Sequence, residues 1–170
     1  MEKIKSFINT IDAINDWTGK IFSWLIIPII AIVVYEVVLR KVFNAPTIWA
    51  FELTTILYGV HFMLGAPHTL LHKGHVSVDL IYSRFSPKVQ AYIDVVTYIL
   101  FFFLFNIVLL WMGTKFAWTS IEMLEKSQSP WRPPLYPIKA IIPVTFFLLI
   151  LQGISKFIRD LTFIIKEDGI

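Results

Sequence analysis

The sequence has no cysteine and few charged residues. Its 170 residues include 15 Lys and Arg and 12 Asp and Glu, whereas 56% of the chain is hydrophobic. The absence of cysteine excludes disulfides and thiol chemistry. A soluble domain of this length needs far more polar surface to cover its core. Together with a mean hydropathy of +0.70, this composition predicts an all-α integral membrane protein.

Recognisable catalytic and nucleic-acid-binding patterns are also missing from the sequence. There is no G-x-S-x-G, no H-E-x-x-H and no phosphate-binding loop, so we expect no enzymatic activity and no catalytic residue. The net charge is only +3 and no Lys/Arg cluster occurs, which favours contact with membrane lipids over nucleic acid. We find no internal repeat of the kind that often marks a self-sufficient secondary transporter.

What the sequence does contain is a series of long apolar runs. A bilayer crossing needs about 20 apolar residues, and four runs meet this length. Residues 1–20 form an amphipathic pattern at helical spacing, which predicts an interfacial helix before the first span. Pro28 is expected to kink the first span. The predicted single domain, 1–170, therefore has spans at residues 21–39, 48–71, 89–114 and 138–158, with a loop at 115–137.

The distribution of basic residues predicts the orientation of the chain. Four spans place both termini on the same side of the membrane, and nine of the 15 Lys and Arg residues then lie on that side. This excess predicts cytoplasmic termini. The loop at 115–137 would then be periplasmic. Its last part, Ser127–Pro137, contains four prolines, so no helix is expected there.

Three charged residues near the first two spans are predicted to hold helices together. Glu36 precedes Arg40 by four residues, which is the favourable order for an ion pair on a helix. Glu52 follows across a short connection, so we predict that Glu52 and Arg40 form a salt bridge between spans one and two. The functional alternative is ion or proton coupling by Glu52, because intramembrane carboxylates are often functional.

All four histidines lie between residues 61 and 75. His61 and His68 are seven residues apart and so project from nearly the same helix face. The simplest interpretation is neutral histidines that hydrogen-bond to neighbouring helices or lipid. Haem between paired histidines is an alternative, but it normally needs ligands from two helices, and no other segment supplies a histidine. We therefore predict no haem and no other cofactor.

A metal site is a further alternative for the histidines. His68, His72 and His75 have the spacing i, i+4 and i+7, which allows three ligands on one helix. Pro67 and Gly74 are expected to interrupt that helix. We therefore predict no metal ligand in the sequence.

Several short stretches, in this order, resemble the small membrane subunit (DctQ type) of tripartite ATP-independent periplasmic (TRAP) transporters. The likeness covers about residues 21–158, and its value lies in the order of the stretches more than in any single motif. The stretches are Glu36–Arg40 with Val42–Asn44, Trp49–Leu53, Lys73–Asp79, Ser129–Trp131 and Pro134–Lys139.

The resemblance implies a multi-pass protein of the bacterial inner membrane that works with two partners. One is a large membrane subunit that carries the substrate and sodium sites. The other is a periplasmic solute-binding protein that delivers an organic acid or a related small solute. The small subunit would act as a scaffold for the large one, and an ion gradient, not ATP, would drive uptake.

We assign roles to three further groups of residues. Lys73, Gly74, His75 and Asp79 are predicted to form an ordered cytoplasmic turn, and the small-residue face at 59–66 is expected to accept a partner helix. The candidate periplasmic docking loop comprises Trp118, Trp131, Arg132, Pro134 and Tyr136.

The competing class is an independent four-helix membrane protein, either a haem-binding redox subunit or an ion-conducting oligomer.

Overall fold

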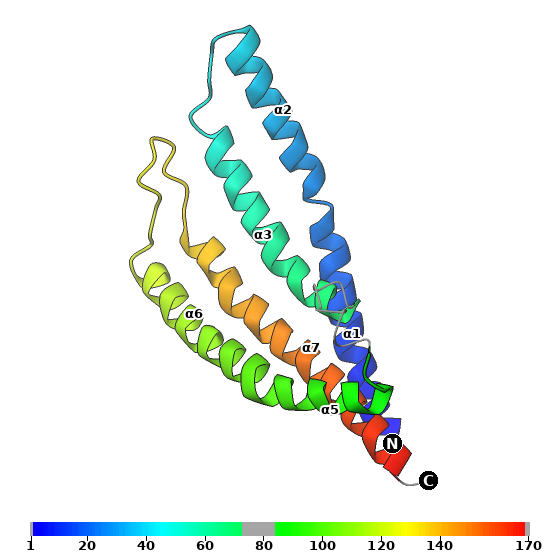
Figure 1. Ribbon diagram of the computed structural model, residues 1–170. Coiled ribbons are helices and arrows are strands. Elements are labelled where there is room, and N and C mark those ends of the chain that lie inside the picture. The colour runs from blue at the N-terminus through cyan, green and yellow to red at the C-terminus, as the bar shows by residue number, and fades with distance from the viewer. Residues whose placement is uncertain (1, 73–83, 169–170) are drawn as a thin grey trace.

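The computed structural model describes residues 2–72 and 84–168, and this part of the chain is helical, with no strand beyond one isolated bridge (Figure 1). The all-helical prediction is therefore confirmed. The first half comprises α1 (Glu2–Ser23), α2 (Ile26–Val42) and α3 (Ala50–Leu71). The second half comprises α5 (Pro87–Thr97), the π-helix η1 (Tyr98–Phe103), α6 (Leu104–Glu122) and α7 (Tyr136–Asp168).

Three helical stretches in the described residues are long and apolar enough to cross a membrane: Ile4–Val42, Pro87–Glu122 and Tyr136–Ile165. They contain the first, third and fourth predicted spans. The second predicted span corresponds to α3, which is not one of the three. With 22 residues, α3 is about 33 Å long at 1.5 Å per residue, which is enough to cross a bilayer. Its polar residues, such as Glu52 and His61, lower its average hydropathy.

The helices form two pairs, and the pairs lie closest together at one end of the molecule (Figure 1). α2 packs on α3, α6 packs on α7, and α3 contacts α7 in the centre. α1 contacts both α3 and α7. Figure 1 shows the two pairs diverging from the end where α1 begins and α7 finishes. The connection between α2 and α3 and the loop 123–135 lie towards the opposite end.

Pro28 explains why the first apolar stretch is divided into two helices. A proline has no N–H to donate to the carbonyl four residues earlier, here that of Trp24, and its ring clashes with that carbonyl. The chain makes a turn at Trp24 and Leu25, whose amides donate over three residues to Ile21 and Phe22, both at 3.2 Å. The predicted kink is confirmed. α1 runs three residues past the predicted boundary.

The later helices begin where the sequence signals predict, and they extend further. Ser86 caps α5, and its side chain accepts from the amide of Val89 at 3.5 Å, with Pro87 in the first turn. The third span continues as helix to Glu122 and the last one to Asp168. The non-helical connection is therefore 123–135, which lies within the predicted periplasmic loop 115–137. The expected absence of helix in Ser127–Pro137 is confirmed up to Leu135, whereas Tyr136 and Pro137 already belong to α7.

Little of the apolar surface is buried within the chain. Only 6% of residues in the most apolar windows of Ile4–Val42 and Pro87–Glu122 are buried, against 22% in Tyr136–Ile165. Large apolar side chains along α2 and α6, such as Ile30, Val34, Phe105 and Trp111, point outward. Since water cannot cover so large an apolar surface at low cost, lipid or partner helices must cover it.

Candidate functional site: helix-fixing contacts and exposed faces

Three of the four best-buried polar side chains among the described residues lie between α1 and α7. The Asp12 carboxylate accepts from Gln152 Nε2 at 3.0 Å and from Ser155 Oγ at 2.9 Å, and it pairs with Arg159. Asn15 Nδ2 donates to Gln152 Oε1 at 2.6 Å. Asn15, Gln152 and Ser155 are at most 1% exposed. We call these five residues the α1–α7 clamp, because buried polar groups need partners and each of these residues has one across the helix interface. Asn15 Oδ1 is buried and has no hydrogen-bond partner among the described residues.

A second polar contact joins α7 to the start of the third span. Lys156 Nζ pairs with Asp94 on α5, lies 3.3 Å from Asp160, and lies 4.6 Å from the centre of the Tyr98 ring. A cation over an aromatic face is favourable. Tyr98 opens the π-helix η1. The Lys156 ammonium group, although it lies on a long apolar helix, therefore has its partners within the same chain.

Glu36 holds the end of α2 and the connection that follows it. Its Oε1 accepts from Arg40 Nη2 at 2.7 Å, and its Oε2 accepts from the hydroxyl and the amide of Thr47 at 2.6 and 3.2 Å. The Thr47 hydroxyl also accepts from the Ala50 amide at 3.2 Å, at the first residue of α3. The predicted ion pair between Glu36 and Arg40 is therefore present. Through Thr47, the contacts of Glu36 extend to the start of α3.

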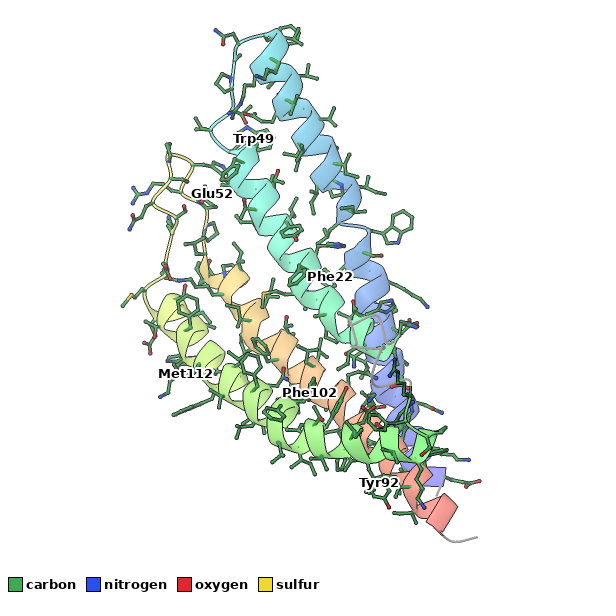
Figure 2. All side chains as sticks on the ribbon, in the orientation of Figure 1. Phe22, Trp49, Glu52, Tyr92, Phe102 and Met112 are labelled. Carbon is green, nitrogen blue, oxygen red and sulfur yellow. The ribbon has the colours of Figure 1, made fainter. Side chains whose placement is uncertain are left out.

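Glu52 has a different partner from the one predicted. It lies in the first turn of α3, and its carboxylate accepts from the hydroxyl of Ser129, 77 residues along the chain. Arg40 pairs with Glu36 on its own helix instead. The predicted Glu52–Arg40 bridge is thus wrong. Glu52 ties α3 to the loop 123–135, towards which it points in Figure 2.

The loop 123–135 is a hairpin with several internal hydrogen bonds. The Ser127 amide donates to the Pro133 carbonyl and the Leu135 amide to the Glu125 carbonyl, both at 2.9 Å. Lys139 Nζ on α7 donates to Glu125 Oε2 at 2.5 Å, which lowers the pKa of Glu125 and keeps this carboxylate ionised at neutral pH. The prolines prevent a helix in this loop, and these hydrogen bonds stabilise the hairpin conformation.

We predict that Glu52→Ala releases this hairpin from α3. The Ser129 hydroxyl loses its acceptor, so the hairpin opens more often and trypsin cleaves faster after Lys126. Limited proteolysis of the purified protein followed by mass spectrometry measures the rate. Glu122→Ala is the control, because within residues 2–72 and 84–168 Glu122 accepts a bond only from Trp118 on its own helix, at 2.6 Å. Equal cleavage rates in the two variants would contradict a tethering role for Glu52.

The structure distributes the predicted docking residues over α6, the hairpin 123–135 and the start of α7. Trp118 lies on α6 and is 62% exposed, and Trp131 in the hairpin is 38% exposed. Arg132 has a positive φ of 51°, and its amide donates to Ser129. Pro134 forms an isolated antiparallel β-bridge with Lys126, and Tyr136 is the first residue of α7. Their docking role stays a prediction. The predicted cytoplasmic turn with Lys73, Gly74, His75 and Asp79 lies outside the described residues.

His61 stabilises the break between α1 and α2. Its Nδ1 lies 2.9 Å from the carbonyl oxygen of Phe22 and donates to it. Phe22 lies one residue before the end of α1, where the turn leaves carbonyl groups without helical partners. This matches the expectation of a histidine that hydrogen-bonds to a neighbouring helix. It also explains how a polar ring and a broken helix coexist in an apolar region.

The two histidines that follow on α3 face α1. His72 Nε2 donates to Asp16 Oδ1 at 3.1 Å, and His68 Nδ1 lies 3.4 Å from the same oxygen. Lys20 binds the other oxygen of Asp16 at 2.5 Å. The prediction that Pro67 interrupts this helix is wrong, because α3 continues through Pro67 to Leu71. A proline is tolerated there because neighbouring helices stabilise the structure.

The glycines separate two kinds of helix face. A Cβ on Gly19 would overlap His68, and one on Gly153 would overlap Phe102, so both mark close helix approaches. A Cβ on Gly59 or Gly65 would meet nothing within 4 Å. The small-residue face that the sequence indicates on α3 therefore does not serve a close approach within the described chain.

Comparison with known proteins identifies the family. The model of the DctQ component of tripartite ATP-independent periplasmic transporters matches residues 29–163. The chain belongs to this family. It is also similar to the sialic acid TRAP transporter permease protein SiaT of Haemophilus influenzae (strain 86-028NP), with 29% identity over 92 residues. That match covers 54% of this chain and 14% of the relative, so this chain spans only a small part of the relative's length.

The DctQ match covers most of the helical part of the chain. The match contains nearly all of α2 and the whole of α3, α5, η1 and α6, and it reaches far into α7. The family is one of transporter components, and the predicted resemblance is confirmed. α1 precedes the match, yet its clamp partners Gln152, Ser155 and Arg159 lie within it.

The α1–α7 clamp is a structural feature that the sequence analysis does not predict. A signal was available: Gln152, Ser155 and Arg159 are spaced by three and four residues, which places them on one face of an otherwise apolar helix. Polar residues in such a row on a membrane helix normally face protein. Their partners, Asp12 and Asn15, repeat this spacing on α1.

Proposed function

We propose that this chain is the small membrane subunit of a TRAP transporter and acts as a scaffold for a large membrane subunit in the bacterial inner membrane. The observation that carries the proposal, beyond family membership, is how the polar side chains are used. Glu36, Glu52, His61 and Lys156 each contact a group of the same chain. Such groups orient helices and are not held open for a solute or an ion.

The proposed topology has four spans, with α3 as the second. α2 and α3 pack along each other and are joined by only seven residues, 43–49, so α3 returns through the same layer as α2. The polar groups of α3 make internal hydrogen bonds, which lowers the cost of burying this helix in lipid. The excess of basic residues on the side of the termini supports a cytoplasmic position for both.

The length of the helices supports the proposal that helical protein extends beyond the membrane on the side of the two termini. Ile4–Val42 has 39 residues, about 58 Å of helix, whereas the hydrocarbon core is about 30 Å thick. α1 therefore extends past the lipid core, as does the end of α7. The α1–α7 clamp joins these two extensions, and its charged members Asp12 and Arg159 suit a position near the headgroups.

The outward face of α3 is the proposed contact surface for the large subunit. Phe51, Tyr58 and Phe62 follow one another along this helix and are 80%, 55% and 66% exposed. Gly59 and Gly65 have open space beside them. Large rings beside small residues form a surface into which another helix can pack closely, and such packing drives helix association in lipid.

The similarity to the SiaT permease supports a role within a larger assembly. The matched segment makes up 14% of that relative, so the match leaves out most of the relative's chain. In our proposal a separate large subunit supplies it, together with the solute and sodium sites. A periplasmic binding protein would deliver an organic acid, the class to which sialic acid belongs, and the hairpin 123–135 would face that protein.

Reconstitution tests this function directly. We expect solute uptake into proteoliposomes driven by a sodium gradient when this chain, a large TRAP membrane subunit and the binding protein are combined. Omission of this chain should abolish uptake. Uptake or ion flux by this chain alone would overturn the proposal and favour an independent four-helix membrane protein, and a haem absorbance band in the purified chain would do so as well.

A size series at one glycine tests the contact surface. We expect Gly59→Leu to reduce co-purification with the large subunit at least tenfold, because the added side chain occupies the space that the partner helix needs. Gly59→Ala is the matched control and should have a much smaller effect. The apparent melting temperature of each variant alone should be no lower than that of the unmodified chain. Normal assembly of Gly59→Leu would exclude this face as the interface.

A further inference from the structure

Asp16, His68 and His72 bring three potential metal ligands together between α1 and α3. One ligand atom from each residue lies within 4.8 Å of the others. His68 and His72 are four residues apart and so share a face of α3, while Asp16 comes from the neighbouring helix α1. Two histidines at this spacing with a ligand from elsewhere are a common arrangement for zinc.

The distances between these atoms suit a tetrahedral ion. Zn–N and Zn–O bonds are about 2.0–2.2 Å long, so ligand atoms around a tetrahedral zinc lie about 3.4 Å apart. Asp16 Oδ1 lies 3.4 Å from His68 Nδ1 and 3.1 Å from His72 Nε2. No large rearrangement of the two helices is required to place an ion between the three atoms.

The state of His68 is the second observation that points to a ligand. Its Nδ1 is buried and makes no hydrogen bond to any described residue, although it lies only 3.4 Å from the Asp16 carboxylate. A buried ring nitrogen without a partner is costly. The close approach of Gly19 to the His68 Cβ fixes this ring against α1, so the nitrogen cannot easily turn to another partner.

From this geometry we propose that Asp16, His68 and His72 bind one divalent transition-metal ion of the zinc class, which links α1 to α3. Imidazole and carboxylate ligands together suit zinc, cobalt and nickel better than calcium or magnesium. The fourth position would be open to water, because the His72 side chain is 57% exposed. The site is independent of the proposed transport role, since it lies within one chain.

Lys20 gives the proposal an unusual test. Its ammonium group binds Asp16 Oδ2 at 2.5 Å and is repelled by any cation at the site, yet its side chain is 68% exposed and contributes little to packing. Removing this charge should strengthen metal binding several-fold. A gain in affinity cannot result from misfolding, which distinguishes a true site from a structural effect.

The experiment uses the full chain in detergent, free of any histidine tag and stripped of metal. Titration with Co²⁺, followed by its visible absorbance and displacement by Zn²⁺, should show one ion per chain. We expect Asp16→Asn and His72→Gln to weaken binding at least tenfold and Lys20→Gln to strengthen it. Zn²⁺ should raise the apparent melting temperature of the unmodified chain but not that of His72→Gln.

Two controls define the outcome that would overturn the site. His61→Gln removes a histidine from the same helix, and His75→Gln removes the third histidine of the pattern i, i+4, i+7; both should bind like the unmodified chain. Binding that depends on His75 but not on Asp16 would overturn the proposal. The absence of saturable binding, or unchanged affinity in Lys20→Gln, would also overturn it.

Discussion

Gly19→Ala should destabilise this protein although it adds only one methyl group. The new Cβ would lie closer to the His68 Cβ than the 3.0 Å that real Cβ atoms keep. The atom that it meets belongs to the root of a side chain and cannot move aside without moving α3. α1 and α3 must therefore separate, and overpacking of this kind costs about 1–3 kcal/mol or more. The apparent melting temperature, followed by tryptophan fluorescence in detergent, measures the loss.

The same substitution at two other glycines is the matched control for Gly19. Gly59→Ala and Gly65→Ala add a methyl group on α3, where nothing lies within 4 Å. Because alanine favours helix over glycine by about 1 kcal/mol, these variants should be as stable as the unmodified chain or slightly more stable. If Gly19→Ala melted at the same temperature as these two variants, the close approach of α1 to α3 would be refuted.

Asp12→Ala should have the second large effect. The Asp12 carboxylate is the acceptor for Gln152, Ser155 and Arg159, and its removal leaves polar groups in the buried α1–α7 interface without a partner. Unpaired buried polar groups cost about 1–3 kcal/mol each, and more when a charge is involved. We expect a loss of about 3 kcal/mol and the release of α1 from α7, seen as a lower melting temperature and faster proteolysis within α1.

Two variants separate the hydrogen bonds of Asp12 from its ion pair. Asp12→Asn keeps an acceptor oxygen for Gln152 and Ser155 but loses the charge that Arg159 needs, so its effect should be intermediate. Arg159→Ala should cost least, because that side chain is 46% exposed and exposed ion pairs contribute little. Asp12→Ala as stable as Arg159→Ala would show that the buried hydrogen bonds of the clamp do not hold α1.

Local sequence signals predicted the helices well because their causes are local. The excess of apolar residues requires lipid, and lipid requires helices, since every backbone polar group must be paired. The break near Pro28 and the start of α5 at Ser86–Pro87 follow from proline geometry and from side-chain capping of free amides. The order of short stretches also indicated the DctQ family, which the family match over 29–163 confirms.

Partners of polar residues could not be predicted in the same way. Glu52 is close in sequence to Arg40, yet its partner is Ser129, and the neighbour of Asp16 is a pair of histidines more than 50 residues away. Spacing along one helix shows which residues share a face. It does not show which helix that face meets, because this depends on how each helix is rotated and crossed in the packed structure.

The sequence by itself determined that this protein is a helical membrane protein, that its first apolar stretch breaks near Pro28, that α5 begins at Ser86–Pro87, and that the chain resembles the DctQ family. Hydropathy, proline geometry and capping act over a few residues, so a single sequence shows them. Only the tertiary structure decided that Asp12 holds α7, that Gly19 rather than Gly59 marks a close approach, and that Asp16 meets His68 and His72. These contacts join residues far apart in the chain, and packing alone brings them together.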